Sequence, residues 1–159
     1  MKLWIGTSGY SYPEWKGSFY PEKISGKKML AYYASKLETV EINYTFRKMP
    51  DEETLMGWLG DVPAGFRFTL KAPEQITHRA RLKKCGKPLR AFLALAEKFE
   101  RRRGALLFQL PPFLKKDAGL LKAFVALLPK GHRSAIEFRN ATWFDDETWP
   151  RCASPRVPS

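Results

Sequence analysis

Polar and charged residues recur at the ends of five strand-like segments, and their chemistry is the first indication of a function. Thr7 and Ser8 lie at the end of the first segment, and Glu41 and Asn43 lie within the second. Later segments end in an amine, an amide, a carboxylate and a guanidinium: Lys71, Gln109, Glu137 and Arg139. The carboxyl ends of parallel strands meet at one side of a sheet, so these side chains would gather around a single rim.

The charged residues of this rim divide into two chemical roles. Glu41 and Glu137 are carboxylates at inward-pointing positions, where burial and a neighbouring cation tune a general acid or base. Lys71 and Arg139 would bind an anionic group such as a phosphate or carboxylate, Arg139 with a bidentate fork. His78, on the loop after the third strand, is a further catalytic candidate. We therefore predict an enzyme that acts on a small anionic substrate.

The other rim residues would hold the substrate in place. We expect contacts to it from seven residues: Thr7, Ser8, Tyr10, Trp15, Asn43, Gln109 and Arg139. A purely structural alternative stays open, in which the four charged residues Glu41, Lys71, Glu137 and Arg139 form an ion-pair network that fills the interior.

The charge of the chain permits a second class of function. Lys and Arg number 28 against 16 Asp and Glu, which gives a formal net charge of +12 at pH 7. A module that binds nucleic acid or nucleotides would use the basic loop 79–84 and the aromatic loop 10–20, with Tyr10, Tyr12, Trp15 and Tyr20 stacking on bases. The alternative is a solvated loop beside core aromatic residues, and the spread of basic residues over helical faces favours it.

Metal and covalent chemistry have little support in the sequence. His78, Glu41 and Glu137 could ligate a divalent ion, but the sequence has no His-x-x-His pair and no clustered Asp/Glu motif typical of a metal site, so we expect neither a metal nor a cofactor. The segment Gly6-Thr7-Ser8-Gly9 has the spacing of neither a nucleotide-binding loop nor a nucleophile elbow.

The sequence indicates no membrane segment and no export signal. Apolar runs stay well short of the roughly 20 residues that cross a bilayer, and the N-terminus reaches Gly6 too soon for a signal peptide. Cys85 and Cys152 are isolated thiols that suit a reducing compartment. We therefore expect a cytoplasmic protein without a membrane partner.

The elements that position the rim alternate between strands and helices. Strand patterns occupy residues 2–9, 38–46, 66–73, 104–110 and 134–139. Helical spacing predicts helices over 27–37, 50–59, 88–103 and 117–128, and the start of another at 143–149. Because the strand at 38–46 lies between two helices, we expect it to be parallel and covered on both faces.

This alternation predicts an α/β fold with a parallel sheet and right-handed crossovers. An open doubly wound sheet and part of a (β/α)₈ barrel both fit the pattern. The lack of a phosphate-binding glycine pattern after the first strand and the polar inward positions favour the barrel.

Eight short motifs, taken together, resemble one protein family. They are Gly6-Thr7-Ser8-Gly9-Tyr10-Ser11-Tyr12, Trp15-Lys16-Gly17, Phe19-Tyr20-Pro21, Thr39-Val40-Glu41-Ile42-Asn43, Lys71-Ala72-Pro73, Ile76-Thr77-His78, Gln109-Leu110-Pro111-Pro112 and Glu137-Phe138-Arg139. The family is called domain of unknown function 72, the YecE-like proteins. The resemblance implies a TIM-type (β/α)₈ barrel of about 240 to 250 residues and no particular activity.

The sequence departs from that family after the fifth strand, where a member would add three more strand–helix units. Residues 150–159 carry three prolines and no apolar periodicity. We interpret residues 1–149 as one incomplete barrel domain and residues 150–159 as a non-native-looking tail, from a truncated or frameshifted reading. A five-stranded piece has two open sheet edges, so we expect self-association, and no activity without the rest of the rim.

Overall fold

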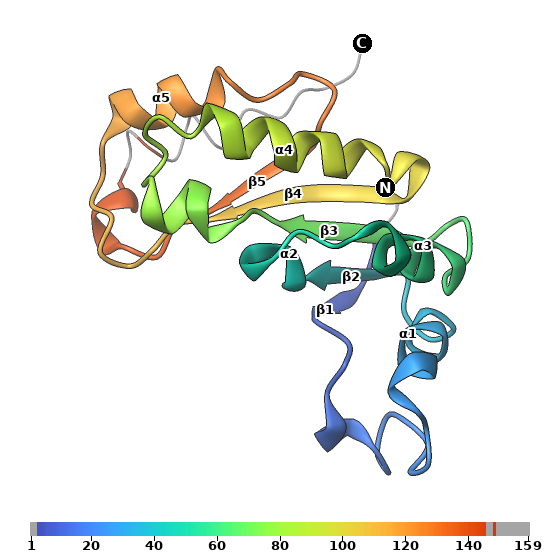
Figure 1. The fold of residues 1–159 in the computed structure, drawn as a ribbon. Coiled ribbons are helices and arrows are strands. Elements are labelled where there is room, and N and C mark those ends of the chain that lie inside the picture. The colour runs from blue at the N-terminus through green and yellow to red at the C-terminus, as the bar shows by residue number, and fades with distance from the viewer. Residues whose placement is uncertain (1–2, 146–147, 149–159) are drawn as a thin grey trace.

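The protein is described by a computed structural model that covers residues 3–145 and residue 148. Its centre is one parallel sheet of five strands in the order β1-β2-β3-β4-β5 (Figure 1). The strands are β1 (Gly6–Ser8), β2 (Thr39–Ile42), β3 (Arg67–Lys71), β4 (Arg103–Gln109) and β5 (Ser134–Glu137). The predicted α/β fold with a five-stranded parallel sheet is confirmed, whereas closure of a barrel stays a prediction.

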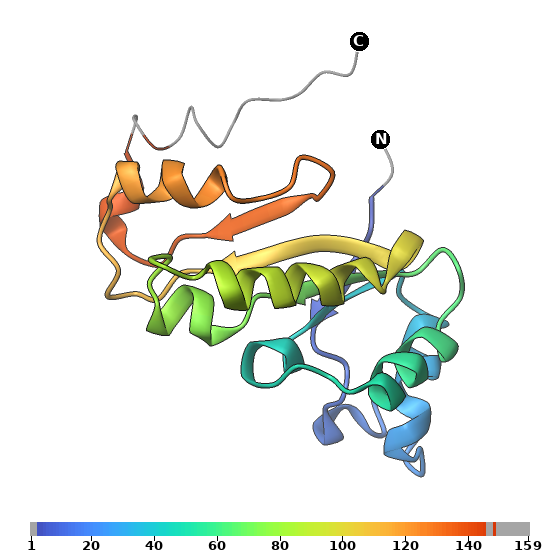
Figure 2. The same cartoon turned by 45° about the horizontal axis from the view of Figure 1, so that its top comes forward.

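Helices connect successive strands. They are α1 (Gly26–Ala34), α2 (Tyr44–Arg47), α3 (Glu52–Gly60), α4 (Gly86–Glu97) and α5 (Ala118–Val125), with shorter turns η1 (Pro13–Trp15), η2 (Gln75–Arg79), η3 (Glu100–Arg102) and η4 (Ala141–Trp143). Figures 1 and 2 show α4 running along β4, with α5 next to β5. None of the described helices combines the length and apolar character that a membrane crossing requires.

Capping carboxylates explain where two helices begin. Asp51 accepts a hydrogen bond from the amide of Thr54 at 2.9 Å, and Asp117 accepts one from the amide of Leu120 at 2.8 Å. Each bond satisfies a backbone donor that has no partner in the first turn of a helix. Helices α3 and α5 therefore start where the chain supplies an acid.

The hydrophobic core lies on the helix-covered face of the sheet. The residues that alternate onto this face are buried: Val40, Ile42, Phe68, Leu70, Leu106 and Phe108. Their neighbours Thr39, Glu41, Thr69 and Lys71 alternate onto the other face and are only half-buried. The prediction that both faces of the 38–46 strand are covered is therefore wrong for the described residues, because the helices pack on one face.

The 38–46 segment also ends as a strand earlier than predicted. Asn43 has the helical dihedrals φ −82° and ψ −17°, and residues 44–47 form α2. The Thr45 hydroxyl approaches the carbonyl oxygens of Ile42 at 3.1 Å and Lys71 at 2.6 Å. These side-chain bonds favour a turn at a position where the alternating pattern predicted more strand.

Other boundaries differ from the predictions by a few residues. Helix α4 ends at Glu97, not at residue 103, because a left-handed residue, Glu100 (φ 47°), and the start of β4 follow it. The predicted loop at 74–84 contains the π-helical turn η2. A 3₁₀ turn, η4, occupies Ala141–Trp143 in place of a helix starting at 143. Residues 146–147 and 149–159, with the proposed tail and Cys152, lie outside the described residues.

Candidate functional site

The strand register brings the predicted rim residues to one side of the sheet. Ser8 pairs with Glu41, and Glu41 pairs with Thr69 of β3. Gln109 of β4 pairs with Glu137 of β5. Because side chains alternate along a strand, these residues all lie on the face opposite the helix-covered core.

A first cluster joins Ser8, Glu41 and Asn43. The Ser8 hydroxyl donates to Glu41 Oε1 at 2.9 Å and accepts from Asn43 Nδ2 at 2.8 Å. Thr7 is not part of this cluster, because its hydroxyl donates to the Gly9 carbonyl at 2.7 Å and contacts the buried Tyr33 hydroxyl at 2.9 Å. Three of the predicted residues are thus held together by one hydroxyl.

A second cluster is centred on Glu137. Its Oε2 accepts from Gln109 Nε2 at 2.8 Å and its Oε1 accepts from Arg139 Nε at 2.8 Å. Burial raises the pKa of Glu137, but these hydrogen bonds and the charges of Arg139 and Lys71 outweigh it, so the pKa lies below its ordinary value. Glu137 is therefore ionised at neutral pH.

Phe46 organises the cationic part of the rim. The Lys71 ammonium lies 5.2 Å from the centre of the Phe46 ring, and the Arg47 guanidinium lies 5.3 Å from it. The His78 ring meets the same ring edge-on at 5.0 Å. The alternating pattern predicts Phe46 on the strand and does not identify it as a site residue, although its neighbour Arg47 and the polar strand before it are signals of a site.

His78 is neutral at neutral pH. Its pKa is lowered mainly by burial and further by the charges of Lys71, Arg139 and Arg47, while Glu74 acts in the opposite direction. Its Nδ1 lies 2.9 Å from the Thr77 hydroxyl. A neutral imidazole beside one carboxylate and three cations can exchange a proton with a bound anion.

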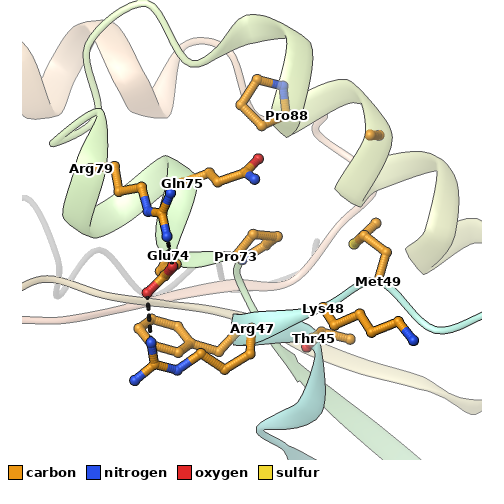
Figure 3. Close-up of a pocket in the computed structure, with 11 residues that line it drawn as sticks. Thr45, Arg47, Lys48, Met49, Pro73, Glu74, Gln75, Arg79 and Pro88 are labelled. Atoms are coloured by element: carbon orange, nitrogen blue, oxygen red, sulfur yellow. Dashed lines mark hydrogen bonds and ion pairs between the residues drawn. The ribbon is translucent and has the colours of Figure 1, made fainter.

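A small cavity of about 130 Å³ is lined by Phe46, Arg47 and Glu74, and Figure 3 shows its lining residues. Glu74 accepts hydrogen bonds there from Arg47, at 3.0 Å, and from Arg79. As Figure 3 shows, a single carboxylate lies between two guanidinium groups, so the wall of the cavity carries a net positive charge.

A larger cavity of about 390 Å³ lies beside the first cluster. Glu41 and Asn43 line it together with four aromatic side chains, Tyr10, Tyr12, Tyr44 and Trp58. The Tyr44 and Trp58 rings meet edge-on at 5.6 Å. Burial raises the pKa of Tyr10, so its hydroxyl stays protonated at neutral pH.

Trp15 and Tyr20 of the aromatic loop pack against the core, Tyr20 fully buried and Trp15 partly buried. Trp15 contacts the rings of Tyr12 at 4.7 Å, Phe19 at 5.7 Å and Tyr20 at 6.1 Å. Tyr20 is buried, and its hydroxyl donates to the Tyr10 carbonyl at 2.5 Å. Of the rings that the sequence suggested for ligand contact, Tyr10 and Tyr12 line the cavity, whereas Trp15 and Tyr20 support the loop.

The described residues contain no group of three or more His, Cys, Asp or Glu side chains placed to hold a metal ion. The carboxylate that acts on His78 is that of Glu74, while Glu137 bonds Gln109 and Arg139 and Glu41 belongs to the other cluster. Cys85 is buried, and its thiol donates to the Leu82 carbonyl at 3.4 Å.

Comparisons with known proteins identify relatives of this chain. It is 29% identical over 143 residues to the UPF0759 protein YecE of Escherichia coli K12, covering 89% of this chain and 50% of that protein. It is 26% identical to the UPF0759 protein YunF of Bacillus subtilis, covering 89% of this chain and 52% of the relative. The chain thus spans about half the length of the curated relatives it matches.

Two solved structures share the fold. A DUF72 family protein from Thermotoga maritima superposes with a TM-score of 0.78 at 29% identity, over 92% of this chain and 59% of that one. One from Enterococcus faecalis gives a TM-score of 0.74 at 23% identity, over 93% of this chain and 55% of that one. The family model described as protein of unknown function DUF72 matches residues 4–154. The chain therefore belongs to the DUF72 family.

Proposed function

We propose that this chain forms part of an enzyme whose strand carboxyl ends bind a small anionic substrate, with Glu137 as the general base. The observation that carries the proposal is the position of Lys71. Its ammonium lies over Phe46 and influences both Glu137 and His78. Among the described residues, no carboxylate lies within ion-pair distance of this ammonium. Lys71 is therefore available to bind an anion.

The pairing of the charged residues supports binding over a purely structural ion network. Arg139 pairs with Glu137 at 2.8 Å. Glu41 is hydrogen-bonded to Ser8, and no cation pairs with it within the described part of the chain. Four charged residues that served only to fill an interior would neutralise one another. Here the Glu41 carboxylate and the Lys71 ammonium form no ion pair within the described residues, so both groups can bind a ligand.

The proposed chemistry follows from the protonation states. Lys71 and Arg139 hold the anionic group, and the Arg139 fork has donors beyond the one that binds Glu137. Ionised Glu137 accepts a proton from the substrate or from water, and neutral His78 can donate or accept one. Ser8, Glu41 and Asn43 orient the rest of the substrate.

Inorganic phosphate titrated into the purified chain by calorimetry tests the anion site. We expect Lys71→Met to weaken phosphate binding about tenfold, the effect of losing about 1.4 kcal/mol of a charge-assisted contact. Lys122→Met removes an exposed lysine of α5 and serves as the matched control. Phosphate binding that is absent, or equal in Lys71→Met and the control, refutes the proposal.

The catalytic role requires a separate measurement. The change that corresponds to Glu137→Gln in a full-length relative such as Escherichia coli YecE should preserve phosphate binding and abolish turnover in a screen of phosphate monoesters and carboxylates. Altered stability with unchanged turnover would show that Glu137 is structural.

Nucleic-acid binding by the basic loop 79–84 is the second candidate. The observation that favours it is the Arg81 guanidinium, which lies on the exposed side of the loop over the Phe113 ring at 5.2 Å. Arg81→Gln should then weaken the salt-dependent binding of a single-stranded oligonucleotide. If the oligonucleotide binds and phosphate does not, this candidate replaces the enzyme proposal.

A further inference from the structure

The aromatic cavity next to Glu41 has the volume and the lining of a site for a flat ring. Four aromatic side chains surround a volume of about 390 Å³: Tyr10, Tyr12, Tyr44 and Trp58. Tyr44 is 41% exposed although it is a large aromatic residue, while Trp58 is buried behind it. An exposed ring that is backed by a buried one offers a face on which a planar ligand can stack.

The polar lining of this cavity includes two side chains with hydrogen-bond acceptors, the Glu41 carboxylate and the Asn43 amide oxygen, beside the hydroxyls of the tyrosines. The Ser8 hydroxyl donates a hydrogen bond to Glu41 Oε1 and accepts one from Asn43 Nδ2. Within the described residues, Glu41 Oε2 and Asn43 Oδ1 accept no hydrogen bond from the protein. A carboxylate can only accept hydrogen bonds, so its ligand must present N–H or O–H donors.

The surrounding charge decides what kind of donor molecule fits. Lys71 follows Thr69, the register partner of Glu41, by two residues on the same face of the neighbouring strand. Strand spacing and rise place Glu41 and Lys71 about 8 Å apart at their Cα atoms. A cationic amine would be repelled by Lys71 and Arg139. A molecule with a donor-rich ring and an anionic tail satisfies both ends.

We propose that the substrate is a purine mononucleotide of the guanine type. The cavity receives the base, Glu41 accepts from its ring N–H and exocyclic amino group, and Lys71 and Arg139 bind its phosphate. The base edge supplies two adjacent donors to one carboxylate, a pairing that discriminates strongly between bases. This assignment rests on the proposed anion site and adds the class of substrate to it.

Calorimetric titration of the purified chain with GMP, IMP, guanosine and ribose 5-phosphate tests the assignment. IMP differs from GMP only by the missing amino group. We expect GMP to bind about tenfold more tightly than IMP, as the loss of one donor to a carboxylate implies. GMP should also bind at least tenfold more tightly than ribose 5-phosphate, because base stacking adds to the phosphate contact.

Three variants assign these effects to residues. Glu41→Gln should abolish the preference for GMP over IMP, while Glu100→Gln, an exposed change in η3 before β4, should preserve it. Tyr44→Ala should weaken GMP at least about fivefold and leave ribose 5-phosphate unchanged. Lys71→Met should weaken GMP and ribose 5-phosphate by the same factor.

The outcomes separate this inference from the proposed function. If GMP and ribose 5-phosphate bind with equal affinity, the base site is refuted and the anion site stands. If GMP and guanosine bind equally and Lys71→Met has no effect, the anion site is refuted and the inference falls with it. A single-stranded oligonucleotide that binds where GMP does not refutes the mononucleotide assignment.

Discussion

At the scale of single residues, Phe46 brings an amine, a guanidinium and an imidazole together around one ring. The face of an aromatic ring attracts cations. The Lys71 ammonium and the Arg47 guanidinium can therefore lie near each other and near His78 although no carboxylate separates the two cations. The pKa of His78 therefore depends on the charges around the Phe46 ring, and a change in those charges should shift it.

Lys71→Met should raise the pKa of His78, because Lys71 is one of the charges that lower it. Titration of the histidine ring protons by NMR measures the shift. The chain has two histidines, and His78→Gln assigns the signals. Lys122→Met should leave the pKa of His78 unchanged, and a His78 pKa that Lys71→Met does not raise contradicts the described geometry.

The same shift predicts a pH dependence of stability. The folded state favours neutral His78, so its contribution to the free energy of unfolding is fully present above the ordinary pKa of about 6.5. That contribution is lost as the pH falls through the lower folded-state pKa. In urea unfolding, the difference between the wild type and His78→Gln should therefore shrink as the pH falls below about 6.5.

Tyr33→Phe should lower the free energy of unfolding by about 1–3 kcal/mol, because buried groups lose hydrogen-bond partners. The Tyr33 hydroxyl accepts from the Thr7 amide at 2.8 Å and donates to the Thr39 carbonyl at 3.0 Å. It therefore ties β1 to β2 and α1. Urea unfolding measures the change. Tyr32→Phe, whose ring is only half-buried, is the control and should change stability by less than about 0.5 kcal/mol.

The sequence identified some site residues and missed others for a physical reason. Ser8, Glu41 and Asn43 belong to consecutive strand ends, so period-two alternation was enough to group them. Phe46 and Trp58 reach the site only through the turn after β2 and the packing of α3. Their positions depend on tertiary contacts that no local pattern encodes.

At the scale of elements, the helix starts follow local chemistry and the strand ends do not. The acids that cap α3 and α5 were visible in the sequence, and the predicted starts lie within two residues of the observed ones. The end of β2 was missed because the Thr45 hydroxyl bonds the Lys71 carbonyl on the next strand. A helix cap is a contact within four residues, whereas this turn depends on a partner 26 residues away.

Asp117→Ala should reduce the free energy of unfolding by about 1 kcal/mol, the usual contribution of an N-cap side chain. Asp117 accepts from the Leu120 amide at 2.8 Å at the start of α5. Ser25 occupies the same position at the start of α1 but makes no capping hydrogen bond. Ser25→Ala is therefore the matched control, and equal losses for the two variants would show that the Asp117 cap contributes nothing.

At the scale of the whole molecule, the outer strands β1 and β5 each have one neighbour within the described residues. Leu106 N donates to Arg133 O at 2.8 Å, and Leu110 N donates to Glu137 O at 2.9 Å. Odd-numbered residues of β5 therefore bond to β4. The amides of Ser134 and Ile136 point to the other edge, where a further strand can pair.

We predict that the purified chain associates in a concentration-dependent way through this edge, as measured by sedimentation velocity. Ser134→Pro removes one edge donor and should reduce the associated fraction severalfold, because proline cannot extend the ladder. Ser134→Ala keeps the donor and should associate like the wild type. A monomer at every concentration, with a cooperative melt, would rule out association through strand edges.

The Thr45 hydroxyl has a consequence for which molecules the rim can accept. It bonds the carbonyls that end β2 and β3, so it fixes the spacing between the strand that carries Glu41 and the strand that carries Lys71. A fixed distance between Glu41 and Lys71 selects ligands in which the ring and the anionic group are separated by a matching length. Thr45→Val would keep the size of the side chain but remove the hydrogen bonds that link the ends of β2 and β3. Ligands with a longer or shorter linker between ring and anion would then bind as tightly as ligands with the matching linker.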